Sequence, residues 1–461
     1  MLFSLKNPTL LLWIFFSSCL VGTYSQLMRL PLRKFQQEKS FLSDTNINFL
    51  EKKGMNIINY YNFNYFGVIQ LGSTGKELRV ILDTGSNILW VRDSNKFGSG
   101  YNSFSCSKSM TCRPDLGFTK TITYGKGKIS GYKVVEQLKL GSLTLPSYNM
   151  LLAQQVSDIP ANIDGILGLS LTSGYDTGFP TVIEKLKSSG LIGTQTFSMF
   201  LGDKPTAKGD VTGEIIFGGY DPKYAIGDFK FVKVKNKLHW ETTLHEVSLG
   251  ADIKVCTKAL NVIFDSGTSL LLLPQDVLKN IVNHLNSKGA NCRYVGGEIS
   301  YKCSCSAVSS LPDLIFHFDG NSFNIPASAY LVRMSYDCEL LIQETIKPPP
   351  GYVDETQGIL GDVFLKNYYA LYTAENRTVG LAPVDNKAGV NGNSGYMDQE
   401  LKMFLIFFAV MTVVGICMYY RHHNREKRTR EVQPLDLVFE GTQKSRLIRE
   451  YEEQATTNPQ L

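Results

Sequence analysis

The sequence predicts an all-β protein of two similar lobes with short helices and one C-terminal transmembrane helix. Short runs of apolar and aromatic residues alternate with turns, and the chain contains 40 glycines, 23 tyrosines and 26 phenylalanines. Its 461 residues are too many for one ordinary hydrophobic core. One unusual pattern, an apolar strand that runs directly into an aspartate, occurs once in each half of the chain. Together these observations favour two related β lobes.

The first copy of this pattern occupies residues 80–90. Three apolar residues lead to Asp83, the chain turns at Thr-Gly-Ser, and a second apolar run ends in Trp90. The second copy, residues 262–270, has Asp265 at the same position. A carboxylate at the end of a buried strand is costly unless it has a use. We therefore expect each lobe to offer one functional aspartate.

The N-terminus has the composition of a targeting segment. Lys6 precedes an apolar run at residues 10–21, and small residues follow. This predicts a cleaved signal peptide at residues 1–25, because an uncleaved anchor needs a longer apolar run. Residues 26–56 then carry six basic residues against three acidic ones. Two interpretations fit this charge: a solvated tail, or a prosegment that covers an acidic cleft.

The central region contains few helical patterns. A long hairpin is expected over residues 119–140, and the glycines around its tip at 124–128 predict a mobile loop. Helices are expected mainly at residues 181–188 and 275–286. Most of the remaining chain to residue 383 has short strand-like runs separated by turns.

The C-terminal part has the order of a membrane anchor. A polar linker at residues 387–402 is followed by about 18 uncharged residues at 403–420, enough for one membrane helix. A strongly basic block then begins the tail, residues 421–461. By the positive-inside rule, the tail is cytosolic and the body is luminal or extracellular. This predicts a single-pass type I protein of the secretory pathway, endolysosome or cell surface.

Charge and cysteine content exclude several classes of protein. The formal net charge of +5 is small for this length, and no basic stripe marks the central region, so nucleic acid is not an expected partner. Seven cysteines lie between the predicted signal peptide and the membrane segment. In a secreted domain they indicate disulfides, and their odd number leaves at least one unpaired within the chain. We expect no metal site, because no histidine cluster has ligand spacing.

The combined motifs resemble those of the pepsin-like aspartic endopeptidases, the family that includes cathepsin D and the plasmepsins. The resemblance covers residues 60–384. It rests on Trp90 and on segments 83–86, 124–125, 164–169, 216–219, 265–269, 359–364 and 379–383. It implies a bilobal domain at residues 57–386, with lobes at 57–225 and 226–386 and a deep cleft between them.

In this family the two aspartates meet at the floor of the cleft and share a proton. The resemblance therefore implies that Asp83 and Asp265 are catalytic, since two adjacent carboxylates cannot both ionise cheaply, as is established for aspartic proteases. One activates a water molecule and the other protonates the peptide carbonyl, so no cofactor is expected. By the same resemblance, the hydroxyls of Ser86 and Thr268 hold the dyad; ordinary turn capping is the alternative.

Further residues are implied to bind the substrate. Gly85 and Gly267 let the backbone approach the peptide, and Ser269 follows the second motif. Tyr124 and Gly125 match the tip of the flap, and Trp90 matches the partner of the flap tyrosine. Ile81 and Ile166 match the lining of the primary side-chain pocket, which implies a preference for apolar residues. Ser266 stands where threonine is commoner, but it keeps the hydroxyl.

Two lysines depart from the family pattern at the flap tip. Lys126 and Lys128 replace small hydroxyl residues. They are either solvated charges or, as an alternative hypothesis, residues that favour acidic groups near the cleavage site.

The resemblance also implies covalent features. Cys106 is expected to pair with Cys112, and Cys338 with Cys305 or Cys303; a pair between Cys256 and Cys292 is a guess. Asn376 begins a sequon for N-glycosylation.

Residues 30–50 resemble a short family prosegment. The lysine that would contact the dyad is unassigned, with Lys52 and Lys53 as candidates, and acid is expected to release the segment.

The leading hypothesis is thus a monomeric, membrane-anchored aspartic endopeptidase that acts on peptides or proteins. The alternatives are a catalytically dead relative that binds peptides in the same cleft, and an adhesive receptor that uses the lobes as a scaffold.

Overall fold

The computed structural model describes residues 27–34, 65–386 and Met418, with gaps at 126, 160, 175–177, 203–210, 296–300, 334–335 and 346–355. The predicted signal peptide, linker, cytosolic tail and membrane helix, Met418 excepted, lie outside the described residues. Within the described part, no helix is long and apolar enough to cross a bilayer. The described residues up to Asn386 belong to one compact unit.

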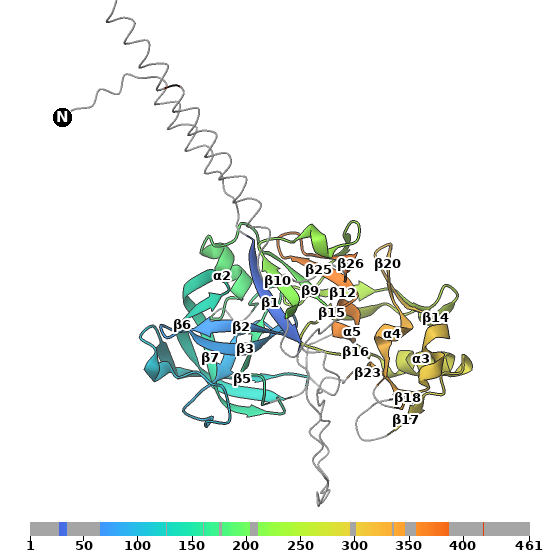
Figure 1. The fold of residues 1–461 in the computed structure, drawn as a ribbon, viewed down its shortest axis with the longest axis horizontal. Helices are drawn as coiled ribbons and strands as arrows, with labels where there is room; N and C mark the ends of the chain where they lie inside the picture. The colour runs from blue at the N-terminus through green and yellow to red at the C-terminus, as the bar shows by residue number, and fades with distance from the viewer. Residues whose placement is uncertain are drawn as a thin grey trace, which may run out of the picture. The chain divides into compact units, whose positions relative to one another are not determined.

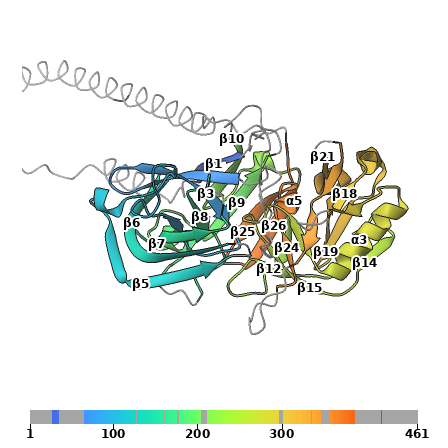
Figure 2. The same ribbon diagram turned by 90° about the horizontal axis from the view of Figure 1, so that it is seen from below.

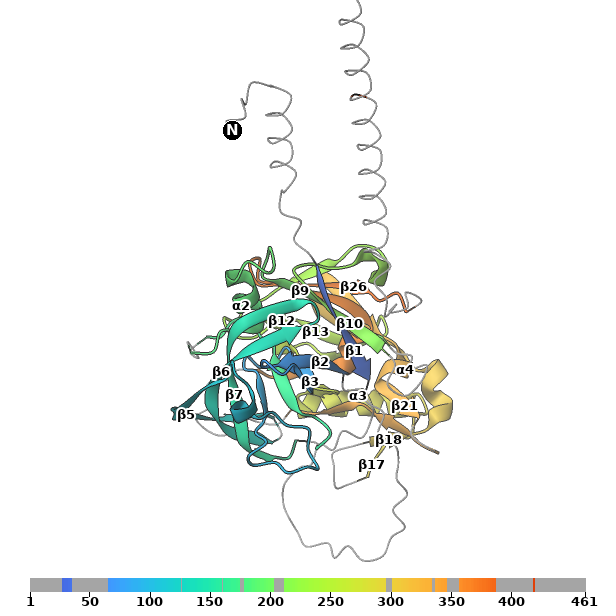
Figure 3. The same cartoon turned by 60° about the vertical axis from the view of Figure 1, so that its left-hand side comes forward.

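The first lobe is built on a large sheet that also includes strands from the end of the chain (Figure 1). In spatial order its 13 strands are β11 (Lys230–Lys233), β26 (Thr378–Pro383), β25 (Tyr368–Thr373), β9 (Thr196–Leu201), β10 (Val211–Phe217), β1 (Met28–Lys34), β2 (Tyr65–Leu71), β3 (Lys76–Asp83), β8 (Gly165–Gly168), β4 (Trp90–Arg92), β7 (Leu143–Ser157), β6 (Lys128–Leu140) and β5 (Arg113–Thr123). Because β25 pairs with β9, this sheet joins the two halves of the chain. Figure 3 shows β26, the strand after β25, close to β9.

The second lobe is built on three smaller sheets. The first contains β12 (Glu241–Leu244), β15 (Leu260–Phe264), β24 (Gly358–Leu360), β16 (Leu271–Leu273) and β23 (Ile342–Glu344). The second contains β14 (Ile253–Cys256), β13 (Glu246–Leu249), β19 (Leu314–Phe318) and β20 (Asn321–Ile325). The third contains β17 (Arg293–Tyr294), β18 (Tyr301–Cys303), β22 (Cys338–Leu340) and β21 (Leu331–Arg333). The mostly-β, bilobal architecture predicted from the sequence is confirmed.

The two lobes repeat one arrangement at their centres. In the first, β3 pairs in parallel with β8, and β4 pairs antiparallel with β8. In the second, β15 pairs in parallel with β24, and β16 pairs antiparallel with β24. Residues 80–82 of β3 and 262–264 of β15 are continuous apolar runs because both faces of these strands are buried there. The aspartate of each lobe lies at the end of the first strand of this set.

The helices are short. α2 (Val182–Ser188) begins after Thr181, whose side chain forms a capping box with Glu184. α3 (Gln275–Ser287) buries one apolar face against the second lobe. Both lie where the sequence predicted helices. The remaining helical segments are α4 (Ala327–Tyr330), α5 (Asp362–Leu365) and the 3₁₀ turns η1 (Cys106–Lys108), η2 (Pro222–Tyr224) and η3 (Cys305–Ser310).

The N-terminal strand β1 makes a contact that neither sequence interpretation included. It pairs with β10 and β2 inside the large sheet, so the described residues of this segment are not a solvated tail. Met28, Leu30 and Leu32 are buried in the core. The alternation of apolar residues at positions 28, 30 and 32 was the signal that could have revealed this strand.

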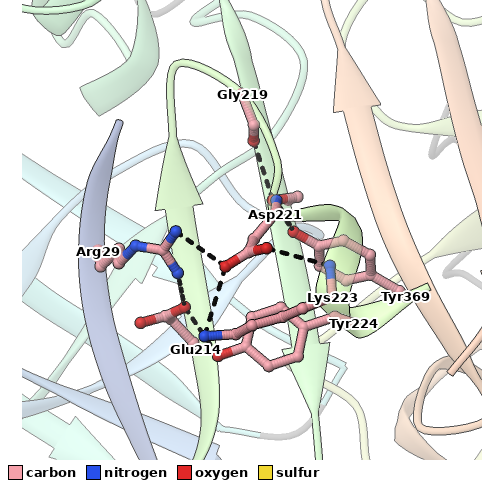
Figure 4. A network of polar contacts seen from close by, with 8 residues as sticks. Arg29, Glu214, Gly219, Asp221, Lys223, Tyr224 and Tyr369 are labelled. Atoms are coloured by element: carbon pink, nitrogen blue, oxygen red, sulfur yellow. Dashed lines mark hydrogen bonds and ion pairs between the residues drawn. The ribbon is translucent and has the colours of Figure 1, made fainter. Parts of the chain in front are cut away.

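Arg29 of β1 points to the opposite face of the sheet and enters a polar network (Figure 4). Its guanidinium donates to Glu214 at 2.8 Å and pairs with Asp221 at 2.9 Å. Tyr224 donates to the same Glu214 carboxylate at 3.0 Å, and Lys223 pairs with Asp221 at 3.3 Å. One of the basic residues of this segment, Arg29, therefore forms ion pairs on the face of the sheet opposite Met28, Leu30 and Leu32. Lys52 and Lys53 lie outside the described residues.

Three disulfides join the six paired cysteines. Cys106–Cys112 and Cys305–Cys338 confirm the expected pairs. The guess for Cys256 is wrong, because Cys292 pairs with Cys303. Cys256 is buried and free. Cys292 and Cys303 are only 11 residues apart, at one end of the antiparallel pair of β17 and β18, where Arg293 lies opposite Lys302. This short spacing was a signal that the sequence interpretation missed.

Candidate active site

Asp83 and Asp265 occupy equivalent positions in the two lobes. β3 ends at Asp83, and Asp265 follows β15 directly. Both side chains are almost buried, with 5% and 7% of their surface exposed. The Gly85 N–H donates to Asp83 Oδ1 at 2.9 Å, and the Gly267 N–H donates to Asp265 Oδ1 at 2.8 Å. One oxygen of each carboxylate is thus held by the backbone of its own turn.

A hydroxyl holds the other oxygen in each lobe. Ser86 Oγ donates to Asp83 Oδ2 at 2.5 Å, and Thr268 Oγ1 donates to Asp265 Oδ2 at 2.6 Å. Short O–H···O distances are typical when the acceptor is charged. The structure therefore brings together both predicted support hydroxyls and both aspartates in one repeated geometry.

The two glycines of the motifs make room for the opposite aspartate. A Cβ at Gly85 would lie 2.8 Å from Asp265 Oδ1. A Cβ at Gly267 would collide in the same way with Asp83. These clashes show that the carboxylates of the two lobes meet here. The sequence interpretation assigned the glycines to substrate access, whereas the contacts in the structure give them this spacing role.

Thr84 and Ser266, which directly follow the aspartates, connect the lobes. The Ser266 N–H donates to Thr84 Oγ1 at 3.0 Å, and the Thr84 N–H donates to Ser266 Oγ at 3.2 Å. The hydroxyls continue to the backbone of the opposite lobe, Thr84 to Phe264 O at 2.8 Å and Ser266 to Leu82 O at 2.6 Å. Sequence reasoning noted only that Ser266 keeps a hydroxyl. The adjacency of each hydroxyl to its aspartate was the signal that could have revealed this pairing.

The environment changes the protonation of Asp83. Burial raises the pKa of Asp83 well above its ordinary value, and the neighbouring Asp265 carboxylate raises it further. The Ser86 hydroxyl and the Gly85 N–H act in the opposite direction but do not offset these effects. Asp83 therefore keeps its proton to a higher pH than an exposed aspartic acid does.

The hairpin of β5 and β6 ends in a tight turn between Tyr124 and Gly127. The Tyr124 N–H donates to Gly127 O at 3.0 Å, and Gly127 has a φ of 84°, which favours glycine. Trp90 Nε1 donates to the Tyr124 hydroxyl at 2.8 Å. Burial and the charge of Asp83 raise the pKa of Tyr124, so its phenol stays neutral. The structure thus brings the predicted flap tyrosine to its predicted partner and close to the dyad.

Comparisons with known proteins agree with this geometry. Residues 64–384 match the family model described as eukaryotic aspartyl protease. The chain is 31% identical over 364 residues to pepsin A of Suncus murinus, which covers 75% of this chain and 90% of the pepsin. It is 34% identical over 334 residues to a pregnancy-associated glycoprotein of Equus caballus, covering 70% of this chain and 82% of that protein.

The chain belongs to the eukaryotic aspartyl protease family.

The crystal structure of an aspartic proteinase from Irpex lacteus aligns with a TM-score of 0.62 and 19% identity, covering 80% of this chain and 100% of that structure. That likeness concerns the fold. The family membership and the pepsin relatives identify the chain as an aspartic endopeptidase.

An apolar cluster lies beside the dyad of this protease. Ile81 and Ile166 are neighbours in the parallel register of β3 and β8, and each has 7% of its surface exposed. They belong to one cluster with Trp90 and Phe179, against which Tyr124 packs. The residues predicted to line the primary pocket are therefore gathered between the dyad strand and the flap.

The other predicted residues have varied positions. Ser269 lies directly after the dyad turn, and its carbonyl accepts the Val363 N–H at 3.2 Å. A Cβ at Gly125 would meet nothing within 4 Å, so the flap tip is open there. Lys128 is exposed, and Lys126 lies outside the described residues. Asn376 is exposed in the turn between β25 and β26.

Asp164, part of the motif at 164–169, has a structural role: its carboxylate holds neighbouring segments together. It is fully buried, and its carboxylate accepts hydrogen bonds from the backbone and side chain of Arg79 and from Asn102. These contacts tie β8 to β3 next to the apolar cluster. Asp164 is thus a further buried carboxylate whose partners explain its burial without catalysis.

Proposed function

We propose that this protease hydrolyses peptide bonds through a dyad of Asp83 and Asp265 that shares one proton. The observation that carries the proposal is the convergence of the two carboxylates from separate lobes, each held by a backbone N–H and a hydroxyl. The ionised member would remove a proton from an attacking water molecule. The protonated member would donate to the carbonyl oxygen as the tetrahedral intermediate forms.

Acidic pH suits this chemistry. The raised pKa of Asp83 keeps one proton in the dyad, and that proton is lost as the pH rises. With both carboxylates ionised, no donor remains for the carbonyl oxygen. We therefore propose an acidic optimum with an alkaline limb set by the dyad.

The substrate is proposed to be a peptide with an apolar residue at the cut. Ile81, Ile166 and Phe179 supply apolar surface beside the dyad, and Tyr124 of the flap closes the same cluster. Buried apolar surface favours an apolar side chain by roughly 25 cal/mol per Å². No cofactor is required by this mechanism.

The location of the enzyme follows from the sequence features at both ends. We propose a luminal or extracellular protease domain, monomeric and glycosylated at Asn376, with a signal peptide at 1–25 and an anchor at 403–420. We further propose that residues 26–56 are a prosegment, held in part by the Arg29 network. Two roles fit this placement: cleavage of other proteins beside the bilayer, and digestion or maturation of proteins in an acidic compartment.

The test uses the full chain in detergent or lipid discs with a library of fluorogenic peptides. Turnover is expected in acid, with apolar residues at the cut and with loss of activity in Asp83→Asn. A wild-type chain that binds peptides but never cleaves them, before or after acid treatment, would support the dead relative. Partner binding that is unchanged by a transition-state-mimicking inhibitor, with no turnover, would support the adhesive receptor.

A further inference from the structure

A cavity of about 330 Å³ lies in the second lobe, at one end of its third sheet. The four strands of this sheet are antiparallel, so β17 and β22 begin where β18 and β21 end. Residues from these strand ends and from the adjoining loops line the cavity. Its volume is at the lower end of the range for sites that bind small molecules.

The cavity is remote from the flap. In Figures 1 and 2, β18 lies on the other side of the domain from β5 and β6, the strands of the flap hairpin. None of the residues in its lining belongs to the dyad turns or to the apolar cluster beside Asp83. The peptidase mechanism therefore gives this cavity no task.

Covalent and hydrogen bonds fix the walls of the cavity. Two disulfides, Cys292–Cys303 and Cys305–Cys338, join the strand ends around it. Between them, the Ser304 N–H donates to Ala290 O at 2.7 Å. The cavity is therefore pre-formed, and a ligand would enter it with little cost for ordering the chain.

The lining of the cavity is basic. It contains three cations, Arg293, Lys302 and Arg333, and one acid, Asp337, so 3 − 1 leaves two positive charges. Arg293 pairs with Asp337 at 3.0 Å, whereas Lys302 and Arg333 form no ion pair with residues that the structure describes. Glu339 lies opposite Lys302 in the sheet register but is not in the lining. The excess charge therefore belongs to Lys302 and Arg333.

Three hydroxyl groups add neutral hydrogen-bond donors. Ser304 Oγ and Ser306 Oγ lie 2.8 Å apart in the wall, and Tyr336, which is 95% exposed, stands at the rim. A guanidinium binds phosphate through two parallel hydrogen bonds, and an ammonium binds it as a point charge. A phosphate monoester carries a charge of roughly −1.5 to −2 at neutral pH, which matches the excess charge of the lining.

We propose that this cavity binds a phosphate monoester. Lys302 and Arg333 would pair with the phosphate oxygens, and the hydroxyls of Ser304 and Ser306 would donate to them. Arg293 would remain with Asp337 and keep the wall in place. The proposal does not depend on the catalytic mechanism proposed above. Its alternative is a solvated basic surface that prefers no anion.

The test is isothermal titration calorimetry of the full chain in detergent, at about pH 7.5 and about 50 mM sodium chloride, where screening is weak. The probes are methyl phosphate and methyl sulfate, which have similar shapes but differ by about one charge. We expect methyl phosphate to bind at least about fivefold more tightly, since the second charge also faces Lys302 and Arg333. No binding of methyl phosphate, or equal binding of both probes, would overturn the proposal.

Variants locate the site. Lys302→Gln with Arg333→Gln should weaken methyl phosphate binding at least about tenfold, because it removes both charged partners. Lys302→Arg with Arg333→Lys keeps the charges and should retain most of the binding. The matched control, Lys76→Gln with Lys279→Gln, removes two exposed lysines outside the cavity and should bind as wild type. Equal weakening in the control and the cavity variant would show a general effect of net charge and would overturn the proposal.

Melting temperature and peptidase activity should be unchanged in these variants, which shows that they fold. A transition-state-mimicking inhibitor of the dyad should not compete with methyl phosphate. Competition would place the phosphate in the catalytic cleft and would overturn the proposal. Titrations with inorganic phosphate, phosphoserine and glucose 6-phosphate then identify the carrier. An ester that binds more tightly than inorganic phosphate supports a monoester ligand, whereas tighter binding of inorganic phosphate than of every ester would overturn it.

Discussion

Thr84 and Ser266 exchange hydrogen bonds across the two lobes, the Ser266 N–H with Thr84 Oγ1 at 3.0 Å and the Thr84 N–H with Ser266 Oγ at 3.2 Å. Thr84 directly follows Asp83 in the chain, and Ser266 directly follows Asp265. The spacing of the dyad therefore depends on a polar contact that neither lobe can make alone.

Loss of this contact should reduce both activity and stability. Ser266→Ala leaves the Thr84 N–H and the Leu82 carbonyl without their buried partner, which costs about 1–3 kcal/mol. We expect a lower melting temperature and at least a tenfold lower kcat. Ser266→Thr keeps the hydroxyl and should retain most of the activity. Equal turnover in Ser266→Ala and wild type would show that the cross-lobe contact does not position the dyad.

Gly85→Ala should inactivate the enzyme. The added Cβ would lie 2.8 Å from the Asp265 carboxylate, so one of the two turns must move. We expect loss of at least a hundredfold in kcat, because misplaced catalytic groups lose their alignment. Gly98→Ala is the matched control, since its Cβ would meet nothing within 4 Å, and it should behave as wild type. Comparable activity of the two variants would contradict the close approach of the carboxylates.

Asp83→Asn should remove turnover by roughly 10²–10⁴-fold or more, the range for loss of a general acid or base. It should also change the dependence of stability on pH. A carboxyl with a raised pKa stabilises the fold fully below its unfolded pKa, and this contribution is lost as pH rises through the folded pKa. The variant lacks that titration, so wild type should lose stability relative to Asp83→Asn between acid and neutral pH. Thermal unfolding at several pH values provides the measurement; parallel curves for the two proteins would exclude a raised pKa.

Trp90→Phe should weaken flap closure. The substitution removes the indole N–H that donates to the Tyr124 hydroxyl at 2.8 Å, while most of the apolar packing remains. We expect a three- to thirtyfold decrease in kcat/KM with a small change in melting temperature. Tyr124→Phe removes the other partner, so the double variant should be little worse than either single one. Strictly additive losses would show that the two side chains act independently.

Acid should loosen β1 through its ion pairs. Burial alone would raise the pKa of Asp221, but the Lys223 amide and the charges of Arg29 and Lys223 lower it below its ordinary value. A depressed pKa stabilises the fold above the unfolded pKa, and this contribution is lost as pH falls through the folded pKa. The loss should therefore occur below about pH 4, the ordinary range for aspartate.

Amide exchange of residues 28–34 between pH 7 and pH 3, after correction for intrinsic rates, measures this release. Arg29→Gln should expose the strand at higher pH, because it removes the cation of β1 that both buried carboxylates contact. Arg33→Gln, at an exposed position of the same strand, is the control and should not. If β1 is released at the same pH in both variants, the Arg29 network does not control the release of the strand.

Much of the site could be predicted from local patterns. The two apolar strands that end in aspartate, the hydroxyl three positions later and the short spacing of Cys106 and Cys112 are all contained in a few consecutive residues. Helices were likewise expected at residues 181–188 and 275–286, where the structure has α2 with its capping box and α3 with its apolar face. Side chains that act within one turn leave a signature in one stretch of chain.

Contacts between distant segments could not be predicted in this way. The order of residues along the chain is enough to place an aspartate after each of two apolar strands, with a glycine and hydroxyls following it. Folding is needed to show that Gly85 clears space for Asp265, that Thr84 bonds to Ser266 and that β1 enters the sheet. These contacts depend on how the two lobes pack and on the register of their strands, which no local pattern encodes.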